Sequence, residues 1–94
     1  MINNNTTITG EILLQLGFKH FGNRTQYGKL IGEFYHKRRL IIGVMTKGGC
    51  EWEYLLEDFY GEEKKIIVKF DKIEKLKMIH FIVLGKELNT NGNR

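Results

Sequence analysis

RLIIGVMTKGGCEWEY, residues 39–54, holds two runs of large side chains on either side of a turn-like segment. The first run is rich in β-branched and other apolar residues, and residues 51–54 alternate Glu, Trp, Glu and Tyr with a period of two. Both patterns are typical of β-strands, and Lys47-Gly48-Gly49 between them has the composition of a turn. We therefore expect an antiparallel hairpin here.

Short apolar runs separated by turns continue on both sides of this hairpin. We predict four antiparallel strands, at Tyr27–His36, Arg39–Thr46, Cys50–Tyr60 and Lys64–Phe70. The turns expected between them are Lys37-Arg38, Lys47-Gly48-Gly49 and Gly61-Glu62-Glu63. The end of the third strand stays open, because residues 55–60 fit either a strand with a bulge or one helical turn.

A short helix is expected before these strands, at residues 10–16. Thr9 fits its N-cap, since a threonine hydroxyl can accept a hydrogen bond from a free N–H of the first turn. Gly17 fits a left-handed residue after the last turn, and Phe18 fits the apolar contact that accompanies such a stop.

A second, amphipathic helix is expected after the strands. Asp71 and Glu74 fit its N-terminal cap, and apolar residues then recur every three or four positions to about Leu84, where Gly85 ends the helix. The sequence thus predicts an α+β fold, with a short N-terminal helix, an antiparallel meander of about four strands and a C-terminal helix packed on the sheet.

The chain has 94 residues, a formal net charge of +4 and 41% hydrophobic residues, which suits a single domain with one core. We expect residues 7–88 to be ordered and the polar ends, residues 1–6 and 89–94, to be loose. No run is apolar enough to span a membrane, and the first residues lack the pattern of a signal peptide. With Cys50 as the sole cysteine no internal disulfide forms, and we expect a cytoplasmic protein.

Residues for catalysis or metal binding do not group in this sequence. His20, His36 and His80 have no partner at metal-ligand spacing, and the chain contains no serine. Cys50 is followed by Glu51, an acidic neighbour that raises the pKa of a thiol rather than activating it. We therefore expect no enzymatic activity, no metal and no cofactor.

Charge is divided into three blocks along the chain. The local sums are +6 for residues 19–47, −6 for residues 51–63 and +5 for residues 64–86. One interpretation is that an acidic third strand pairs with basic neighbours across the sheet. The other is that these segments bind partners.

The acidic block alternates large aromatic rings with carboxylates, and such rings dominate the energetics of many protein interfaces. A basic protein, such as one that binds RNA, would be attracted to it. The alternative is that Trp52 and Tyr54 belong to the core of the domain. The candidate protein-binding residues are Glu51, Trp52, Glu53, Tyr54, Glu57, Asp58 and Tyr60, with Phe59 among them.

The basic turn between the first two predicted strands is the second candidate. Cations there would contact phosphates, and neighbouring rings would stack on bases of RNA or single-stranded DNA. The candidate nucleic-acid-binding residues are Tyr35, His36, Lys37, Arg38 and Arg39.

The run LKMIHFIVLGKEL, residues 76–88, resembles the ending of a group of small phage and prophage proteins, Leu-x-Asn-Leu-Tyr-Phe-x-Leu-Thr-Gly-x-Glu-Leu. Those proteins also begin with a Thr-capped helix that closes on Leu-Gly-Phe, here residues 16–18. The chain departs from the pattern at Met78, His80 and Leu84. The resemblance implies a shared fold and an origin in a mobile element, acting inside the host cell.

Taken together, these features predict a non-enzymatic phage protein that inhibits a host protein, and an anti-CRISPR protein acting on a basic RNA-guided nuclease is the most specific version. One alternative is a small RNA- or single-stranded-DNA-binding protein. Another is a homodimer or virion component, because apolar residues occupy more than one face of the last helix. The expected contact is either an exposed strand edge or the Met78, Phe81 and Ile82 flank of that helix, unless the first helix covers this flank.

Overall fold

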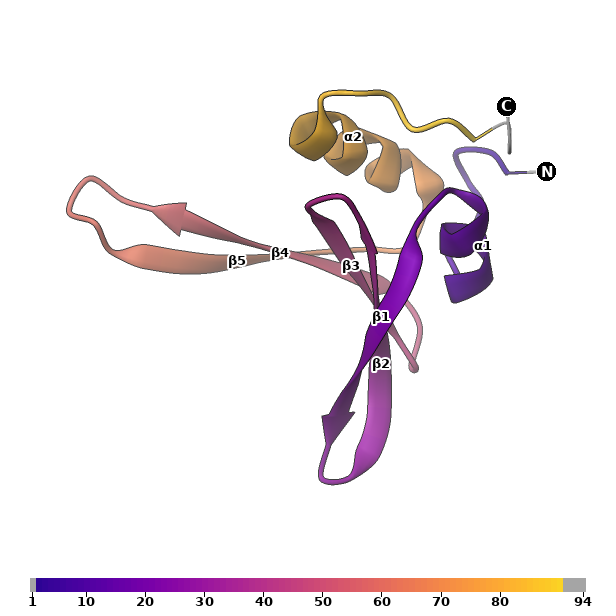
Figure 1. Ribbon diagram of the computed structural model, residues 1–94, viewed down its shortest axis with the longest axis horizontal. Coiled ribbons are helices and arrows are strands. Elements are labelled where there is room, and N and C mark those ends of the chain that lie inside the picture. Colours follow the sequence, from indigo (N-terminus) through magenta and orange to yellow (C-terminus); the bar gives the residue numbers. More distant parts are fainter. Residues whose placement is uncertain (1, 91–94) are drawn as a thin grey trace.

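The computed structural model describes residues 2–90, and its elements run α, five strands, α (Figure 1). They are α1 (Gly10–Gln15), β1 (Lys19–Gln26), β2 (Lys29–Lys37), β3 (Leu40–Met45), β4 (Cys50–Glu57), β5 (Glu63–Phe70) and α2 (Ile73–Leu84). The strands form one antiparallel sheet in chain order, β1-β2-β3-β4-β5. The predicted α+β fold with a meander and a C-terminal helix on the sheet is confirmed, with one strand more than expected.

Strand β1 is the element that the sequence did not reveal. It is exposed on both faces along most of its length, and its ladder with β2 contains two register shifts, so no alternation of apolar and polar residues marks it. Tyr27 and Gly28, with φ angles of 52° and 77°, form the turn to β2. The strand predicted from Tyr27 therefore begins at Lys29.

Helix α1 follows the sequence prediction closely. The Thr9 hydroxyl accepts a hydrogen bond from the Ile12 N–H at 3.2 Å. Gly17 has a φ of 93°, and the Phe18 N–H donates to the Leu13 carbonyl at 2.9 Å, which satisfies a carbonyl of the helix end. Both the cap and the glycine stop are confirmed.

The start of α2 differs from the prediction. Its N-cap residue is Lys72 rather than Asp71, and no side chain of residues 2–90 caps the helix. Instead, the Ile73 and Glu74 N–H groups each donate at 3.1 Å to carbonyls of Thr6 and Asn4. An N-terminal segment that packs on the helix thus satisfies the free N–H groups that an aspartate cap would otherwise serve.

This contact also concerns the N-terminal segment, which we expected to be loose. Within residues 2–6, the Thr6 N–H donates to the Asn3 carbonyl, Asn4 accepts a hydrogen bond from Lys77, and Ile2 packs against the core. We expected this segment to be loose, whereas it covers the start of α2. Residues 1 and 91–94 of the two predicted tails lie outside the described residues.

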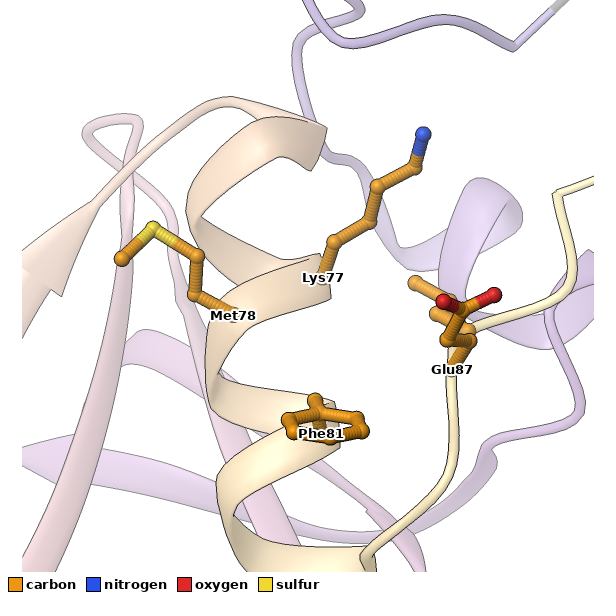
Figure 2. A pocket seen from close by; sticks show the side chains of 5 residues that line it. Lys77, Met78, Phe81 and Glu87 are labelled. Atoms are coloured by element: carbon orange, nitrogen blue, oxygen red, sulfur yellow. The ribbon is translucent and has the colours of Figure 1, made fainter.

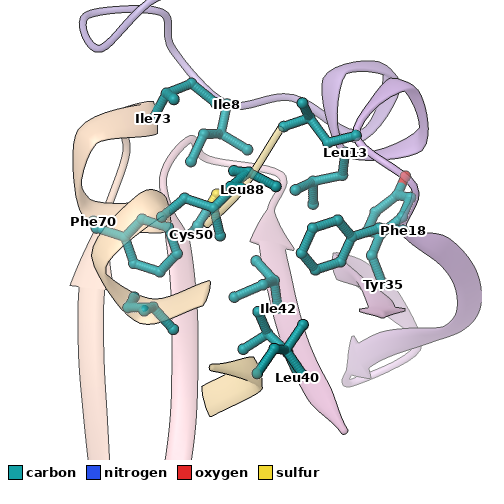
Figure 3. Packing of buried hydrophobic residues seen from close by; sticks show 14 residues of the cluster. Ile8, Leu13, Phe18, Tyr35, Leu40, Ile42, Cys50, Phe70, Ile73 and Leu88 are labelled. Carbon is teal, nitrogen blue, oxygen red and sulfur yellow. The ribbon is translucent and has the colours of Figure 1, made fainter. Parts of the chain in front are cut away.

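The core lies between α1, α2 and the middle of the sheet (Figure 3). Its fully buried side chains include residues of both helices, of β3 and of the start of β4. They are Leu13, Phe18, Leu40, Ile42, Cys50, Ile73 and Leu76. The core therefore ends near Cys50 and Phe70, where β4 leaves β3 and β5 joins α2.

The sheet changes width beyond this core. The β3–β4 ladder consists of Gly43 opposite Glu51 and Val44 opposite Cys50, whereas β4 and β5 stay paired from Cys50 and Phe70 out to Glu57 and Glu63. The β4–β5 hairpin consequently projects from the body as a two-stranded ribbon (Figure 1). We call its outer part, residues 53–67, the β4–β5 arm.

The open question about residues 55–60 is resolved in favour of a strand that ends early. Leu55 and Leu56 continue the ladder without a bulge, and β4 ends at Glu57. The Asp58 carboxylate then accepts hydrogen bonds from the Tyr60 and Glu62 N–H groups at 2.8 and 2.9 Å. This aspartate-stabilised turn replaces the last three residues of the predicted strand.

Candidate binding surface on the β4–β5 hairpin

The β4–β5 hairpin has one apolar and one mainly charged face. Side chains that are opposite each other in an antiparallel ladder lie on the same face. The apolar face carries the pairs Trp52 with Val68, Tyr54 with Ile66 and Leu56 with Lys64. The other face carries Glu53 with Ile67, Leu55 with Lys65 and Glu57 with Glu63. The apolar face is thus continuous with the core beneath α2 and extends beyond it.

Trp52 marks the point where this face leaves the core. It is half-buried, packs against the core cluster and stacks on Tyr54 with ring centroids 4.6 Å apart. Farther out, Tyr54 is 37% exposed and Leu56 is 52% exposed. The alternative that Trp52 belongs to the core is therefore supported for that ring, while Tyr54 and Leu56 beyond it are only partly covered by the described residues.

Two of the carboxylates proposed for partner binding have partners within the chain. Glu51 pairs with Arg24 of β1 at 3.1 Å, and Glu53 pairs with Lys65 of β5 at 3.3 Å. Arg24 lies on β1 and Glu51 on β4, so the pair spans the two strands between them, β2 and β3. Charge pairing across the sheet, one of the two interpretations, thus holds for this inner part of the acidic block.

The turn of the hairpin is different, and we call residues 57–63 the acidic tip. Phe59 and Tyr60 are 95% and 86% exposed and meet edge to face, with ring centroids 5.5 Å apart. Glu57, Glu62 and Glu63 are exposed and form no ion pair with the described residues. Two rings and three unpaired carboxylates therefore stand together on a turn held by Asp58.

The candidate nucleic-acid site, by contrast, is mostly engaged inside the fold. We call residues 37–39 the basic tip. Lys37 donates to the Leu16 carbonyl at 3.1 Å and lies over the Phe18 ring, and Arg39 donates to the Val83 carbonyl. Burial, and to a lesser degree the neighbouring Arg38, lowers the pKa of Lys37. Two of the three cations thus tie the β2–β3 turn to α1 and α2.

The aromatic members of that site are also separated from one another. Tyr35 is buried in the core, where burial first and Glu33 second raise its pKa. His36 lies on the opposite face of β2 against Phe21, with ring centroids 5.2 Å apart. Only Arg38 of the basic tip stands exposed without such a contact, so no stacking platform is assembled there.

Within residues 2–90 no three His, Cys, Asp or Glu side chains group as metal ligands. Burial, and less strongly Asp71, raises the pKa of Cys50 to about 12, so the predicted direction holds but its cause is burial rather than Glu51.

Among residues 2–90 no helix has the length and apolar character needed to cross a membrane.

Helix α2 carries a second exposed apolar patch. Met78, Phe81 and Ile82 are 53%, 56% and 69% exposed on the side away from the sheet, so α1 does not cover them. A pocket of about 450 Å³ adjoins this patch, lined by Lys77, Met78, Phe81, Glu87 and Leu88 (Figure 2). This is the flank that the sequence offered as a contact between copies.

No protein-family model, curated protein or solved structure matches this chain. The resemblance of its two ends to small phage proteins stays a prediction.

Proposed function

We propose that the chain is a non-enzymatic binding protein that uses the acidic tip of its β4–β5 hairpin to occupy a basic, ring-accepting groove on a partner protein. The observation that carries this proposal is the pair Phe59 and Tyr60, almost fully exposed beside carboxylates that form no ion pair within residues 2–90. Tyr and Phe are both enriched in the buried centres of protein interfaces, and Tyr is also enriched among interface hot spots.

The shape of the hairpin supports the same function. A two-stranded ribbon is marginally stable by itself in water, and large exposed apolar side chains favour burial against a partner. The apolar face of the arm would then be covered by the partner in the way that α2 covers the inner sheet. Inner pairs such as Glu53 with Lys65 keep the ribbon in register, while the tip supplies the recognition.

The charge of the tip favours a partner with an excess of Lys and Arg. Residues 57–63 carry four acids and no base. Opposite charges speed encounter and help to select the partner. A nucleic-acid-binding groove has this chemistry, and its occupation by the tip would block the nucleic acid. The predicted role as a phage inhibitor of a host protein, and of an RNA-guided nuclease in particular, is the version of the proposal that we favour.

Capture from a bacterial lysate followed by a blocking assay tests this function. Immobilised wild-type chain is expected to retain a basic nucleic-acid-binding protein, and the free chain is expected to inhibit nucleic-acid binding by that protein once purified. The Phe59→Ser, Tyr60→Ser variant should lose both effects. Tyr27→Ser is the matched control, because Tyr27 is also a ring on a hairpin turn and is 94% exposed.

Two results would overturn the proposal. One is that wild-type chain retains nothing above the bead background or retains only acidic proteins. The other is that the Phe59→Ser, Tyr60→Ser variant retains and blocks the same protein as well as wild type does, which would place the contact elsewhere.

A further inference from the structure

The outward face of α2 and the acidic tip have complementary surfaces. The α2 face carries Met78, Phe81 and Ile82, each more than half exposed. The tip carries two exposed rings. Apolar side chains of this kind are stabilised when they leave water together, so each surface can serve as the cover for the other.

The charges of the two surfaces are opposite as well. Residues 72–87 hold four lysines against Glu74 and Glu87, a net charge of +2, whereas residues 57–63 hold a net charge of −4. Lys72 and Lys77 donate to Thr7 and Asn4, which are neutral, so these contacts leave the positive charges in place.

The geometry of one chain keeps these surfaces apart. The β4–β5 ladder holds the tip at the far end of the ribbon, and Figure 1 shows that end well away from α2. The tip therefore cannot fold back on the helix of its own chain without breaking the ladder. A second copy can supply it.

We propose that the chain forms a homodimer in which the acidic tip of each copy packs on the Met78, Phe81 and Ile82 face of α2 in the other. The exchange is reciprocal, so one two-fold axis relates two identical contacts. Because an aromatic side chain buries about 150–250 Å², four rings with the helix faces that receive them approach the total of about 1,200–2,000 Å² found in stable interfaces.

This inference uses the tip that the proposed function assigns to a partner protein, so self-association and partner binding compete. The dimer and the proposed function can therefore be disproved independently. A monomeric wild-type chain would overturn the dimer while leaving partner capture intact. A dimer that captures no basic protein would overturn the proposed function alone.

Light scattering on the full chain at micromolar concentration tests the dimer. Wild type is expected to have twice the mass of one chain. Phe81→Glu on the helix face, and Phe59→Ser with Tyr60→Ser on the tip, should each weaken association at least about tenfold, as truncation of interface anchors does. Circular dichroism should show both variants folded, because all three side chains are exposed. Tyr27→Ser should leave the dimer unchanged.

Mixing the two defective variants gives the sharper result. The Phe81→Glu copy keeps an intact tip and the tip variant keeps an intact helix face, so an equimolar mixture should recover one contact and form mixed dimers. Higher salt should weaken the dimer, because the attraction between tip and helix is partly electrostatic. A monomeric wild type, a variant that associates as tightly as wild type, or a mixture that contains no more dimer than either variant alone would overturn the proposal.

Discussion

The two charged turns of this sheet differ in how much they contact the rest of the fold. The basic tip, residues 37–39, packs on the body: Lys37 and Arg39 donate to carbonyls at the ends of the two helices. The acidic tip, residues 57–63, projects from the body, and its rings and most of its carboxylates contact nothing else in the described chain. Charge at a turn therefore does not identify a binding surface by itself. A charged turn is a candidate binding surface only if its side chains are not already engaged in contacts within the fold.

The largest expected difference between the turns concerns the aromatic ring at each. Phe18 lies beneath Lys37 and is 2% exposed, whereas Phe59 is 95% exposed. Phe18→Ala should lower the free energy of unfolding by about 3–5 kcal/mol, because it removes a core ring and leaves a cavity. Phe59→Ala should change it by less than about 0.5 kcal/mol. Urea denaturation measures both, and equal losses would contradict the contrast.

The cations of the basic tip should matter less than the ring beneath them. Arg39→Ala and Lys37→Ala should each lower the free energy of unfolding by about 1 kcal/mol, since each removes a hydrogen bond to a carbonyl near a helix end. Arg38→Ala is the control, because Arg38 is exposed and makes neither contact. If Arg38→Ala were the most damaging of the three, the structural role of the basic tip would be wrong.

The basic tip also affects the pH dependence of stability through His80. His80 is buried, its Nδ1 donates to the Lys86 carbonyl at 2.7 Å, and its Nε2 has no hydrogen-bond partner among the described residues. Burial lowers its pKa; the Lys86 carbonyl opposes this shift, and the nearby charges of Lys37 and Arg38 add to it.

Because the folded pKa of His80 lies below the unfolded value of about 6.5, the unfolded chain binds the proton more readily. The stability contributed by neutral His80 is therefore complete above about pH 6.5 and is lost as the pH falls. Urea midpoints measured at about pH 7 and about pH 5 should move closer together in His80→Phe than in wild type. An unchanged difference would assign the acid sensitivity to other groups.

The smallest effect on stability is expected at the acidic tip. Glu62→Lys with Glu63→Lys should change the free energy of unfolding by less than about 0.5 kcal/mol, because both side chains are exposed and form no ion pair with another described residue. The same change should weaken capture of a basic partner. Thermal denaturation beside capture separates the two readouts, and a variant that unfolds easily would show that the tip belongs to the fold.

The sequence predicted α1 from its Thr9 cap, both helix ends from Gly17 and Gly85, and α2 and four of the five strands from their apolar patterns, although the expected Asp71 cap was wrong. It did not predict β1, whose residues are exposed on both faces and leave no such pattern. It also marked the acidic aromatic segment as a candidate surface. It could not separate Glu51 and Glu53, which pair with Arg24 and Lys65, from the unpaired carboxylates of the tip.

The basic tip shows the same limit of sequence-based prediction, here for cations that prove to have partners within the fold. Lys37 and Arg39 look like free cations in the sequence, because the Leu16 and Val83 carbonyls that they contact are 21 and 44 residues away. Only tertiary structure reveals such partners. The one available signal for the acidic tip was local: two adjacent rings, Phe59 and Tyr60, beside a turn marked by Asp58 and Gly61.

Photo-crosslinking compares the two tips directly in the folded protein. A benzophenone amino acid is placed at position 59 or at position 38 of the full chain, with position 27 as a control of matched exposure, since Tyr27 is 94% and Phe59 is 95% exposed. Irradiation in bacterial lysate should give covalent adducts, with a partner or with a second copy, from position 59 alone. Equal adducts from all three positions, or adducts from position 38 and none from position 59, would contradict the assignment of binding to the acidic tip.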